Sequence, residues 1–352
     1  MIRVVVAEDS STVRELLVRI LEDDPEVRVV GQAKDGAEAV ELVSSLKPDL
    51  VTMDVHMPTM DGFDATKQIM IRAPTPIVIV SSSSSQREVE LSLRALRAGA
   101  LAAVAKPDRP GSADFDSRCA QLVSTVKAMA NVRVVRQWEP RERVRGSRPA
   151  ATGAVRLVAM VASTGGPAAL QRIFAGLAGE FPVPIVVVQH VANGFVDGLA
   201  DWLNGSCSLH VKVAEHGERL ESRTVYLAPD DQHLGVDGAG RAVLASSPPI
   251  DRFRPSGTHL FQSAARAYGS SLVAVILTGM GADGVEGLRA VKAAGGRVLA
   301  QDEASSVVYG MPGQAVKSGM VDVVLSIDEI GPRLMQLASE GGEGDARAHP
   351  RR

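Results

Sequence analysis

The chain has 352 residues, enough for two or three domains that each bury a core of their own. A formal net charge of −3 provides no bulk positive field for nucleic acid or an anionic membrane, and 3% aromatic residues leave few platforms for base stacking. The two cysteines lie far apart, and no apolar run has the length of a signal peptide or a membrane span. We therefore expect a cytoplasmic protein that neither binds nucleic acid nor inserts into a membrane.

Residues 1–131 alternate β-branched runs with segments of helical period, which is typical of a parallel sheet covered by helices on both faces. The predicted strands are Ile2–Ala7, Val27–Gly31, Leu50–Asp54, Ile77–Ser81 and Leu101–Ala105. Helices are predicted near 11–23, 36–46, 62–72, 86–98 and 115–130. The pattern indicates one complete doubly wound α/β domain.

Residues 132–153 lose this periodicity and carry several arginines among Pro and Gly, so we interpret them as a linker. A second α/β pattern over 154–339 predicts a larger domain of the same doubly wound, parallel class. Its predicted strands are Val155–Ala162, Ile185–Gln189, Thr224–Ala228, Leu272–Leu277, Arg297–Gln301 and Val321–Leu325. Residues 340–352 are Gly-rich and charged, and we expect them to be disordered.

Charged and hydroxyl side chains follow the strands of the first domain at their carboxyl ends, where open parallel sheets form their functional crevice. They are Glu8, Asp9, Asp54, Ser81 and Lys106. Three carboxylates placed so close together repel one another unless a hard cation such as Mg²⁺ is bound. With the cation present, the central Asp54 can attack a phosphoryl group while Lys106 and Ser81 contact the product. The alternative for any single Asp is that it merely caps the next helix.

These residues, together with the Asp54-Val55-His56-Met57-Pro58 and Lys106-Pro107 motifs, resemble the receiver domain of two-component response regulators. The resemblance implies that a histidine kinase phosphorylates Asp54. It also implies that Mg²⁺ is held by Glu8, Asp9, Asp54 and the backbone carbonyl of His56. The family usually has an aromatic residue three positions before the lysine, but this chain has Ala103, so an aromatic rotamer switch is not available.

In the second domain, the first strand runs directly into Ser163-Thr164-Gly165-Gly166-Pro167. The glycines allow a tight turn and Pro suits the first helical turn, so Ser163 is predicted at a helix N-terminus above the strand end. Such a serine could be a nucleophile, a simple N-cap, or part of a Gly-rich phosphate cradle. The glycine spacing matches neither the P-loop nor the dinucleotide fingerprint.

His190 follows the second predicted strand of this domain, and Asp283 lies in the Gly-rich loop after Leu272–Leu277. Ser163, His190 and Asp283 thus occupy three strand ends of one sheet, which is how a catalytic triad is assembled from distant residues. His233 is the competing histidine, because it too follows a strand. The alternative for Asp283 is an ordinary turn residue.

Together with Gln189-His190, Thr278-Gly279-Met280-Gly281 and Gly310-Met311-Pro312-Gly313, these motifs resemble the chemotaxis protein-glutamate methylesterases, the CheB family. The resemblance implies hydrolysis of glutamyl γ-methyl esters on chemoreceptors, with Ser163, His190 and Asp283 as the triad and no cofactor for the esterase reaction. It also implies deamidation of receptor glutamines. For the oxyanion we expect backbone N–H groups of Thr164, Gly165 and Met280.

The sequence departs from this family after His190 and within Arg254-Pro255-Ser256-Gly257-Thr258, which lacks the usual Asp after that serine. Both segments could border the crevice and alter substrate preference. Two other functions stay open on the sequence alone: a phosphorylation-switched adaptor whose hydrolase domain is inactive, and a serine esterase that acts on a different ester.

Overall fold

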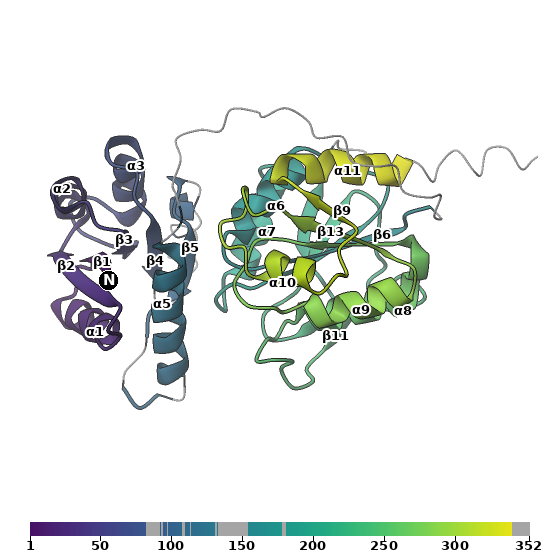
Figure 1. Cartoon of the computed structure of the whole chain (residues 1–352), viewed down its shortest axis with the longest axis horizontal. Coiled ribbons are helices and arrows are strands. Elements are labelled where there is room, and N and C mark those ends of the chain that lie inside the picture. The colour runs from purple at the N-terminus through teal and green to yellow at the C-terminus, as the bar shows by residue number, and fades with distance from the viewer. Residues whose placement is uncertain are drawn as a thin grey trace, which may run out of the picture. The chain divides into compact units, whose positions relative to one another are not determined.

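The computed structural model of the chain describes residues 1–81, 92, 94–96, 98–107, 110–112, 114–130, 132, 154–177 and 181–339. The chain divides into two compact units, Met1–Arg145 and Gly146–Arg352 (Figure 1). The helix predicted near 86–98, the linker predicted at 132–153 and the tail predicted at 340–352 lie largely or wholly outside the described residues.

The first unit is built on a parallel five-stranded sheet in the order β2-β1-β3-β4-β5. Its strands are β1 (Ile2–Ala7), β2 (Val27–Ala33), β3 (Leu50–Met53), β4 (Ile77–Ser81) and β5 (Ala102–Ala105). Helices α1 (Ser11–Glu22) and α5 (Phe115–Met129) pack on one face, and α2 (Gly36–Leu46) and α3 (Gly62–Arg72) pack on the other (Figure 1).

Local sequence accounts for these helices. The Ser10 hydroxyl and the Asp35 and Asp61 carboxylates each accept a hydrogen bond from a backbone N–H of the first turn, at the starts of α1, α2 and α3. Such caps satisfy backbone donors that have no partner inside the helix. The central strands β3 and β4 are buried along their whole length, as expected for a sheet covered on both faces.

The second unit has a parallel seven-stranded sheet in the order β14-β13-β12-β6-β7-β9-β8. Its strands are β6 (Leu157–Ala162), β7 (Ile185–Gln189), β8 (His210–Val213), β9 (Thr224–Leu227), β12 (Leu272–Ile276), β13 (Arg297–Gln301) and β14 (Val323–Leu325). Its helices are α6 (Gly166–Ala175), α7 (Val196–Asn204), α8 (Gly257–Tyr268), α9 (Val285–Ala293), α10 (Met311–Lys317) and α11 (Ile327–Ser339), with a short 3₁₀ turn at Gly269–Ser271.

The predicted fold class, two doubly wound parallel α/β domains, is confirmed, and the predicted elements that lie in the described ranges end within two residues of the observed ones. The edge strand β8 and the antiparallel hairpin of β10 (His233–Val236) and β11 (Ala242–Ala245) were not predicted from the sequence. β8 is interrupted by Lys212 and β10 by Gly235, so neither shows the continuous apolar run of a strand such as β6.

In both sheets, the connections that follow two adjacent central strands lead to opposite sides of the sheet. The order places β1 next to β3 in the first sheet and β6 next to β12 in the second, while β2 and β7 lie on the far side of β1 and β6. Such a switch point opens a crevice at the carboxyl ends of the two strands. Glu8 and Asp54 border the first crevice, and Ser163 and Thr278 border the second.

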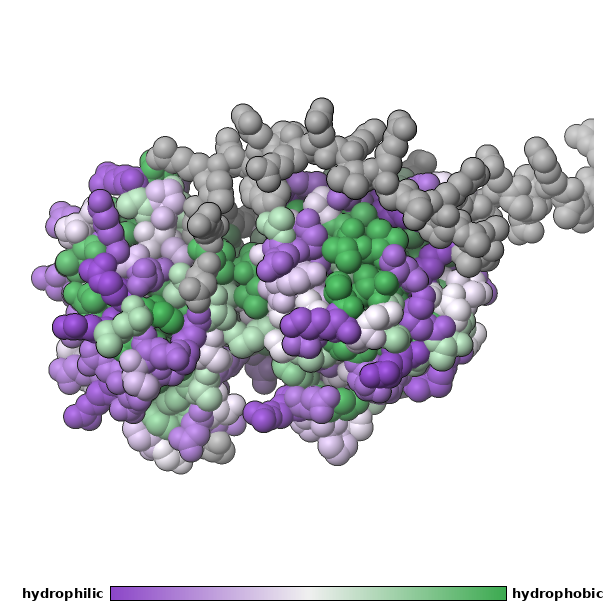
Figure 2. Space-filling view, viewed as in Figure 1, coloured by the Kyte–Doolittle hydropathy of each residue, from purple (hydrophilic) through white to green (hydrophobic). Residues whose placement is uncertain are grey.

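No helix in the described ranges is both long and apolar enough to cross a bilayer. Figure 2 shows hydrophilic residues over the visible face of each unit, interrupted by hydrophobic areas.

Helix α8 approaches β6 closely at its first residue, Gly257. A Cβ atom at this position would lie 2.5 Å from Cγ1 of the buried Val161. A β-branched side chain in a packed sheet has little freedom to move away. The glycine therefore sets the distance between helix and sheet.

We predict that Gly257→Ala destabilises the second unit by about 1–3 kcal/mol, because the added methyl overpacks the contact between α8 and β6. The measurement is urea unfolding followed by circular dichroism. Gly238→Ala is the matched control, since a Cβ there would meet no atom within 4 Å. Equal stability of the two variants would contradict the prediction.

Candidate functional site

Ser163 lies in a tight turn between β6 and α6. Its N–H donates to the Thr278 carbonyl at 3.0 Å, and its own carbonyl accepts from the N–H of Gly166 at 2.8 Å. Gly165 has a φ of 77°, in the left-handed region that favours glycine. This turn holds the half-buried Ser163 at the carboxyl end of the sheet, before a helix N-terminus.

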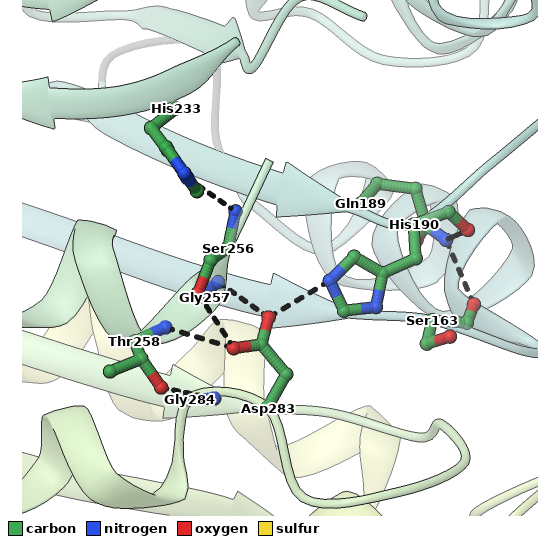
Figure 3. Close-up of polar contacts among 9 residues, drawn as sticks. All are labelled: Ser163, Gln189, His190, His233, Ser256, Gly257, Thr258, Asp283 and Gly284. Carbon is green, nitrogen blue, oxygen red and sulfur yellow. Dashed lines mark hydrogen bonds and ion pairs between the residues drawn. The ribbon is translucent and has the colours of Figure 1, made fainter. Parts of the chain in front are cut away.

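His190 follows β7 and reaches toward the same crevice. Its N–H donates to the Ala162 carbonyl at 3.0 Å, which ties it to the turn that carries Ser163. Its ring nitrogen Nε2 lies 2.9 Å from Oδ2 of Asp283. The other ring nitrogen, Nδ1, is buried, has no hydrogen-bond partner in the described part of the chain, and lies on the side of the ring nearer Ser163 (Figure 3). The imidazole thus lies between the serine and the carboxylate.

The Asp283 side chain is held by a cradle of donors at the start of α8. Oδ1 accepts from the Ser256 hydroxyl at 2.8 Å and from the Thr258 N–H at 3.2 Å, and Oδ2 accepts from the Gly257 N–H at 2.6 Å. Burial alone would raise the pKa of Asp283, but the hydrogen bonds from His190 and this cradle outweigh it and hold the pKa below its ordinary value. Asp283 is therefore a carboxylate at neutral pH.

The competing histidine, His233, is buried on the other side of this cradle. Its Nδ1 accepts from the backbone N–H of Ser256 at 3.2 Å, and its Nε2 contacts the carbonyl of Pro248 at 3.1 Å. His233 thus supports the backbone that holds Asp283, and His190 is the histidine bonded to the carboxylate (Figure 3).

Several residues of this network were not found from the sequence. Ser256, Gly257 and Thr258 were noted only as a segment that could border the crevice, and two of their three contacts to Asp283 come from backbone N–H groups. Backbone donors leave no residue-type signature. Gln189 was named only as part of the Gln189-His190 motif and without a role, although its side-chain amide donates to the carbonyls of Ser163 and His190 at 2.8 and 2.9 Å.

The expected oxyanion donors lie in loops around Ser163. Thr164 and Gly165 belong to its own turn, and the backbone of Gly279 passes so close that a Cβ there would lie 2.6 Å from Cβ of Ser163. Met280 is the next residue. Within the described ranges, the N–H groups of Thr164, Gly165 and Met280 take part in no backbone hydrogen bond. Their role as oxyanion donors stays a prediction.

In the first unit, the carboxyl ends of β1, β3 and β5 bring together the predicted acidic pocket. One carboxylate oxygen from each of Glu8, Asp9 and Asp54 lies within 4.8 Å of the others. The Lys106 ammonium contacts Glu8 at 2.9 Å and Asp54 at 3.0 Å. Glu8 and Asp54 are buried, whereas Asp9 is exposed.

The charges of this pocket are not fully compensated. Burial, and next the neighbouring Asp54, raise the pKa of Glu8 to about 7 although Lys106 opposes the shift. Burial also raises the pKa of Asp54 despite the ammonium. Burial lowers the pKa of Lys106, but the two carboxylates outweigh it and leave that pKa above its ordinary value. One ammonium does not neutralise three carboxylates, so the pocket favours a further cation.

The remaining predicted residues of this pocket have different surroundings. Ser81 ends β4 and is fully buried, and its hydroxyl has no hydrogen-bond partner among the residues that the structure describes. His56 is half-buried two residues after Asp54, and its backbone N–H hydrogen-bonds the Asp54 carboxylate. A buried, unpartnered hydroxyl is costly, so a polar group that reaches Ser81 would satisfy it.

Each of the two units matches a known protein family. The family model described as CheB methylesterase matches residues 158–334, and the response regulator receiver domain model matches residues 4–112. The chain belongs to the CheB methylesterase family. Its first unit is a response regulator receiver domain.

Two curated relatives cover nearly the whole chain. A protein-glutamate methylesterase/protein-glutamine glutaminase of Myxococcus xanthus is 52% identical over 95% of this chain and 96% of its own length. A relative with the same description in Anaeromyxobacter dehalogenans is 54% identical over 95% and 98%. The crystal structure of the Thermotoga maritima CheB methylesterase catalytic domain is 42% identical, with a TM-score of 0.51, over 52% of this chain and 99% of that domain.

We predict that Ser256→Ala slows the reaction of Ser163 with a fluorophosphonate about 10- to 100-fold, because the Asp283 carboxylate loses a hydrogen bond. The rate is measured by mass spectrometry of the labelled chain. Ser247→Ala is the control, since Ser247 is an exposed serine that precedes the cradle by nine positions. A Ser256→Ala rate equal to that of the control would show that the hydroxyl is dispensable.

Proposed function

We infer that this chain is a phosphorylation-regulated protein-glutamate methylesterase. It hydrolyses glutamyl γ-methyl esters on chemoreceptors, deamidates glutamine side chains there, and works in the cytoplasm. The observation that carries this proposal is the hydrogen bond between His190 and a buried, ionised Asp283 on the side of the ring away from Ser163. Membership in the CheB family, whose curated relatives are named for both activities, supports the choice of substrate.

The reaction begins at the Ser163 hydroxyl. Oγ attacks the ester carbonyl carbon, and Nδ1 of His190 takes the hydroxyl proton. The tetrahedral intermediate collapses when the C–O bond to the methoxy group breaks, and His190 returns the proton so that methanol leaves. Water then attacks the acyl-enzyme with Nδ1 again as base, which releases glutamate and restores Ser163. For a glutamine substrate the leaving molecule is ammonia.

Asp283 determines which nitrogen acts as the base. An ionised carboxylate only accepts hydrogen bonds, so the neutral ring carries its proton on Nε2, the nitrogen 2.9 Å from Oδ2. The lone pair is therefore on Nδ1, toward Ser163. When the ring becomes an imidazolium, the same carboxylate stabilises the charge.

The oxyanion of each intermediate needs donors near the serine. The N–H groups of Thr164, Gly165 and Met280 are the candidates, because their loops surround Ser163 and these donors have no backbone acceptor in the described ranges. In a known serine protease, removal of one such donor costs about 10²–10³ in rate.

In the receiver unit, we assign Asp54 as the phosphoryl acceptor and a histidine kinase as the phosphodonor. The all-oxygen cluster of Glu8, Asp9 and Asp54, with uncompensated charge, fits Mg²⁺, and the His56 carbonyl is the fourth candidate ligand. When bound, Mg²⁺ would supply charge neutralisation for phosphoryl transfer. Lys106, which contacts Asp54, would pair with the phosphoryl group, and the Ser81 hydroxyl, which has no partner among the described residues, would donate to it.

The direct test is methanol release from a methylated chemoreceptor cytoplasmic fragment. We expect Ser163→Ala to lower the rate about 10³-fold or more, because the nucleophile is lost. The variant should still bind the fragment. Absence of methanol release by the wild-type chain, together with intact binding, would favour the adaptor function. Hydrolysis of a small ester alone would favour an esterase with another substrate.

Regulation is tested by adding acetyl phosphate and Mg²⁺ to the same assay. We expect the phosphodonor to stimulate methanol release by the wild-type chain and not by Asp54→Asn, which cannot form the aspartyl phosphate. Asp49→Asn is a control carboxamide in the same unit, since Asp49 bonds the N–H of Arg3 and lies outside the acidic pocket. Stimulation that survives in Asp54→Asn would rule out this acceptor.

Chelation tests which of the two activities, stimulated or unstimulated, requires a metal ion. Excess EDTA should abolish stimulation by acetyl phosphate but leave unstimulated methanol release unchanged, because among the described residues the acidic pocket is the cluster that could hold a metal ion. Added Mg²⁺ should restore the stimulation. Loss of the unstimulated activity in EDTA would contradict a metal-independent triad.

A further inference from the structure

One aromatic side chain in contact with His190 has no part in the mechanism above. The Phe253 ring is stacked on the His190 imidazole, with ring centroids 4.3 Å apart and planes inclined by 14°. Phe253 is half-buried and lies in the loop that leads from β11 to the start of α8. The same segment therefore contacts both partners of the His190–Asp283 pair: Phe253 contacts the ring, and residues 256–258 contact the carboxylate.

The loop that carries Phe253 is held by hydrogen bonds and an ion pair of its own. Ile250 and Phe253 exchange two backbone hydrogen bonds, of 3.1 and 2.8 Å, across a tight turn. Asp251 and Arg252 within this turn have φ values of 49° and 73°, which are unfavourable for residues other than glycine. The guanidinium of Arg254 pairs with Asp231 at 2.6 and 2.8 Å. Strained backbone persists where the surroundings over-determine it, and such segments cluster at active sites.

The hydrogen-bond network leaves the orientation of the ring incompletely determined. Asp283 anchors Nε2, but Nδ1 has no hydrogen-bond partner within the described ranges. A single hydrogen bond fixes one atom of the ring and allows the plane to tilt. A flat ring at stacking distance supplies the missing constraint, so that Nδ1 keeps its direction toward Ser163.

The stack also bears on charge. When His190 takes the serine proton, its ring becomes cationic while still against the face of Phe253. The negative face of an aromatic ring attracts a cation within about 6 Å, and more strongly where water is excluded. An aliphatic side chain of similar size would pack against the ring without this attraction.

We propose that Phe253 is a positioning residue of the active site, which fixes the plane of the His190 ring and stabilises the imidazolium that forms when Ser163 is activated. This inference rests on the proposed function of Ser163 and His190.

The other charged groups on segments that border His190 have contacts that do not involve the Phe253 side chain. Asp283 is bonded to Nε2, Asp230 accepts from the N–H of Gly194, and Asp231 is paired with Arg254, while Arg252 is exposed. A pH effect of a change at Phe253 is therefore attributable to the ring contact.

The experiment compares Phe253→Leu with Phe253→Tyr in the full chain. The probe is a fluorophosphonate: Oγ of Ser163 bonds to phosphorus, fluoride leaves, and the serine proton passes to Nδ1. The labelling rate is measured as a function of pH. We expect Phe253→Leu to lower the plateau about 3- to 10-fold and to move the acid limb about 0.5–1 pH unit downward, because a less stabilised imidazolium forms only at lower pH.

Phe253→Tyr keeps the aromatic face and should match the wild type in plateau and midpoint. Arg252→Ala, a change of the exposed neighbour in the same turn, should match it too. A Phe253→Leu profile equal to that of the wild type would overturn the proposal. So would a lower plateau with an unmoved midpoint, since loss of packing alone would produce it.

A second readout does not depend on catalysis. The ¹⁵N resonances of His190, assigned by their loss in His190→Gln, should titrate at lower pH in Phe253→Leu than in the wild type. Wild-type labelling no faster than that of Ser163→Ala would refute the proposed function, and the titration would still decide the role of Phe253. An unmoved titration midpoint would overturn that role even in an active enzyme.

Discussion

The second unit depends on one buried negative charge, the carboxylate of Asp283. An ionised carboxylate is expensive to bury unless it is hydrogen-bonded on all sides. Here His190, Ser256 and two backbone N–H groups supply those bonds, and these donors come from two segments that are far from each other and from Asp283 in the sequence. The bonds that compensate the buried charge are thus the bonds that fix the geometry of the site. A movement of α8, of the β7 end or of the loop before α9 would break one or more of them.

The acidic pocket of the first unit solves a related problem in the opposite way. Glu8 and Asp54 are also buried, but Lys106 is the only ammonium that contacts them in the described ranges, and burial raises the pKa of both carboxyl groups. Asp283 has a lowered pKa because its hydrogen bonds outweigh burial. The contrast matches the proposed roles. A triad carboxylate serves best when its charge is permanent and its partners are fixed, whereas a regulatory pocket must change its charge when a cation or a phosphoryl group arrives.

Both sites occupy the same position in their sheets. Each lies at the carboxyl ends of two central strands from which the chain departs in opposite directions, β1 with β3 and β6 with β12. The helices diverge there, so side chains from several strand ends can meet without competing for a packed core. Rigid strands hold the attachment points, and the loops between them supply the chemistry. In the second unit the loop over 250–258 adds a further layer, because it contacts both His190 and Asp283.

Much of this protein was readable from its sequence. Strand periodicity indicated both parallel sheets, and polar residues directly after buried strands indicated Glu8, Asp54, Ser163 and His190, since the carboxyl ends of parallel strands share one edge. Two things were decided only by the tertiary structure: which backbone N–H groups hold the Asp283 carboxylate, and which ring covers His190. They depend on the path of the loop between the β10–β11 hairpin and α8, which contacts His190 and Asp283. The physical reason is that backbone donors and packing contacts have no residue-type signature, so the path of the chain in space determines them.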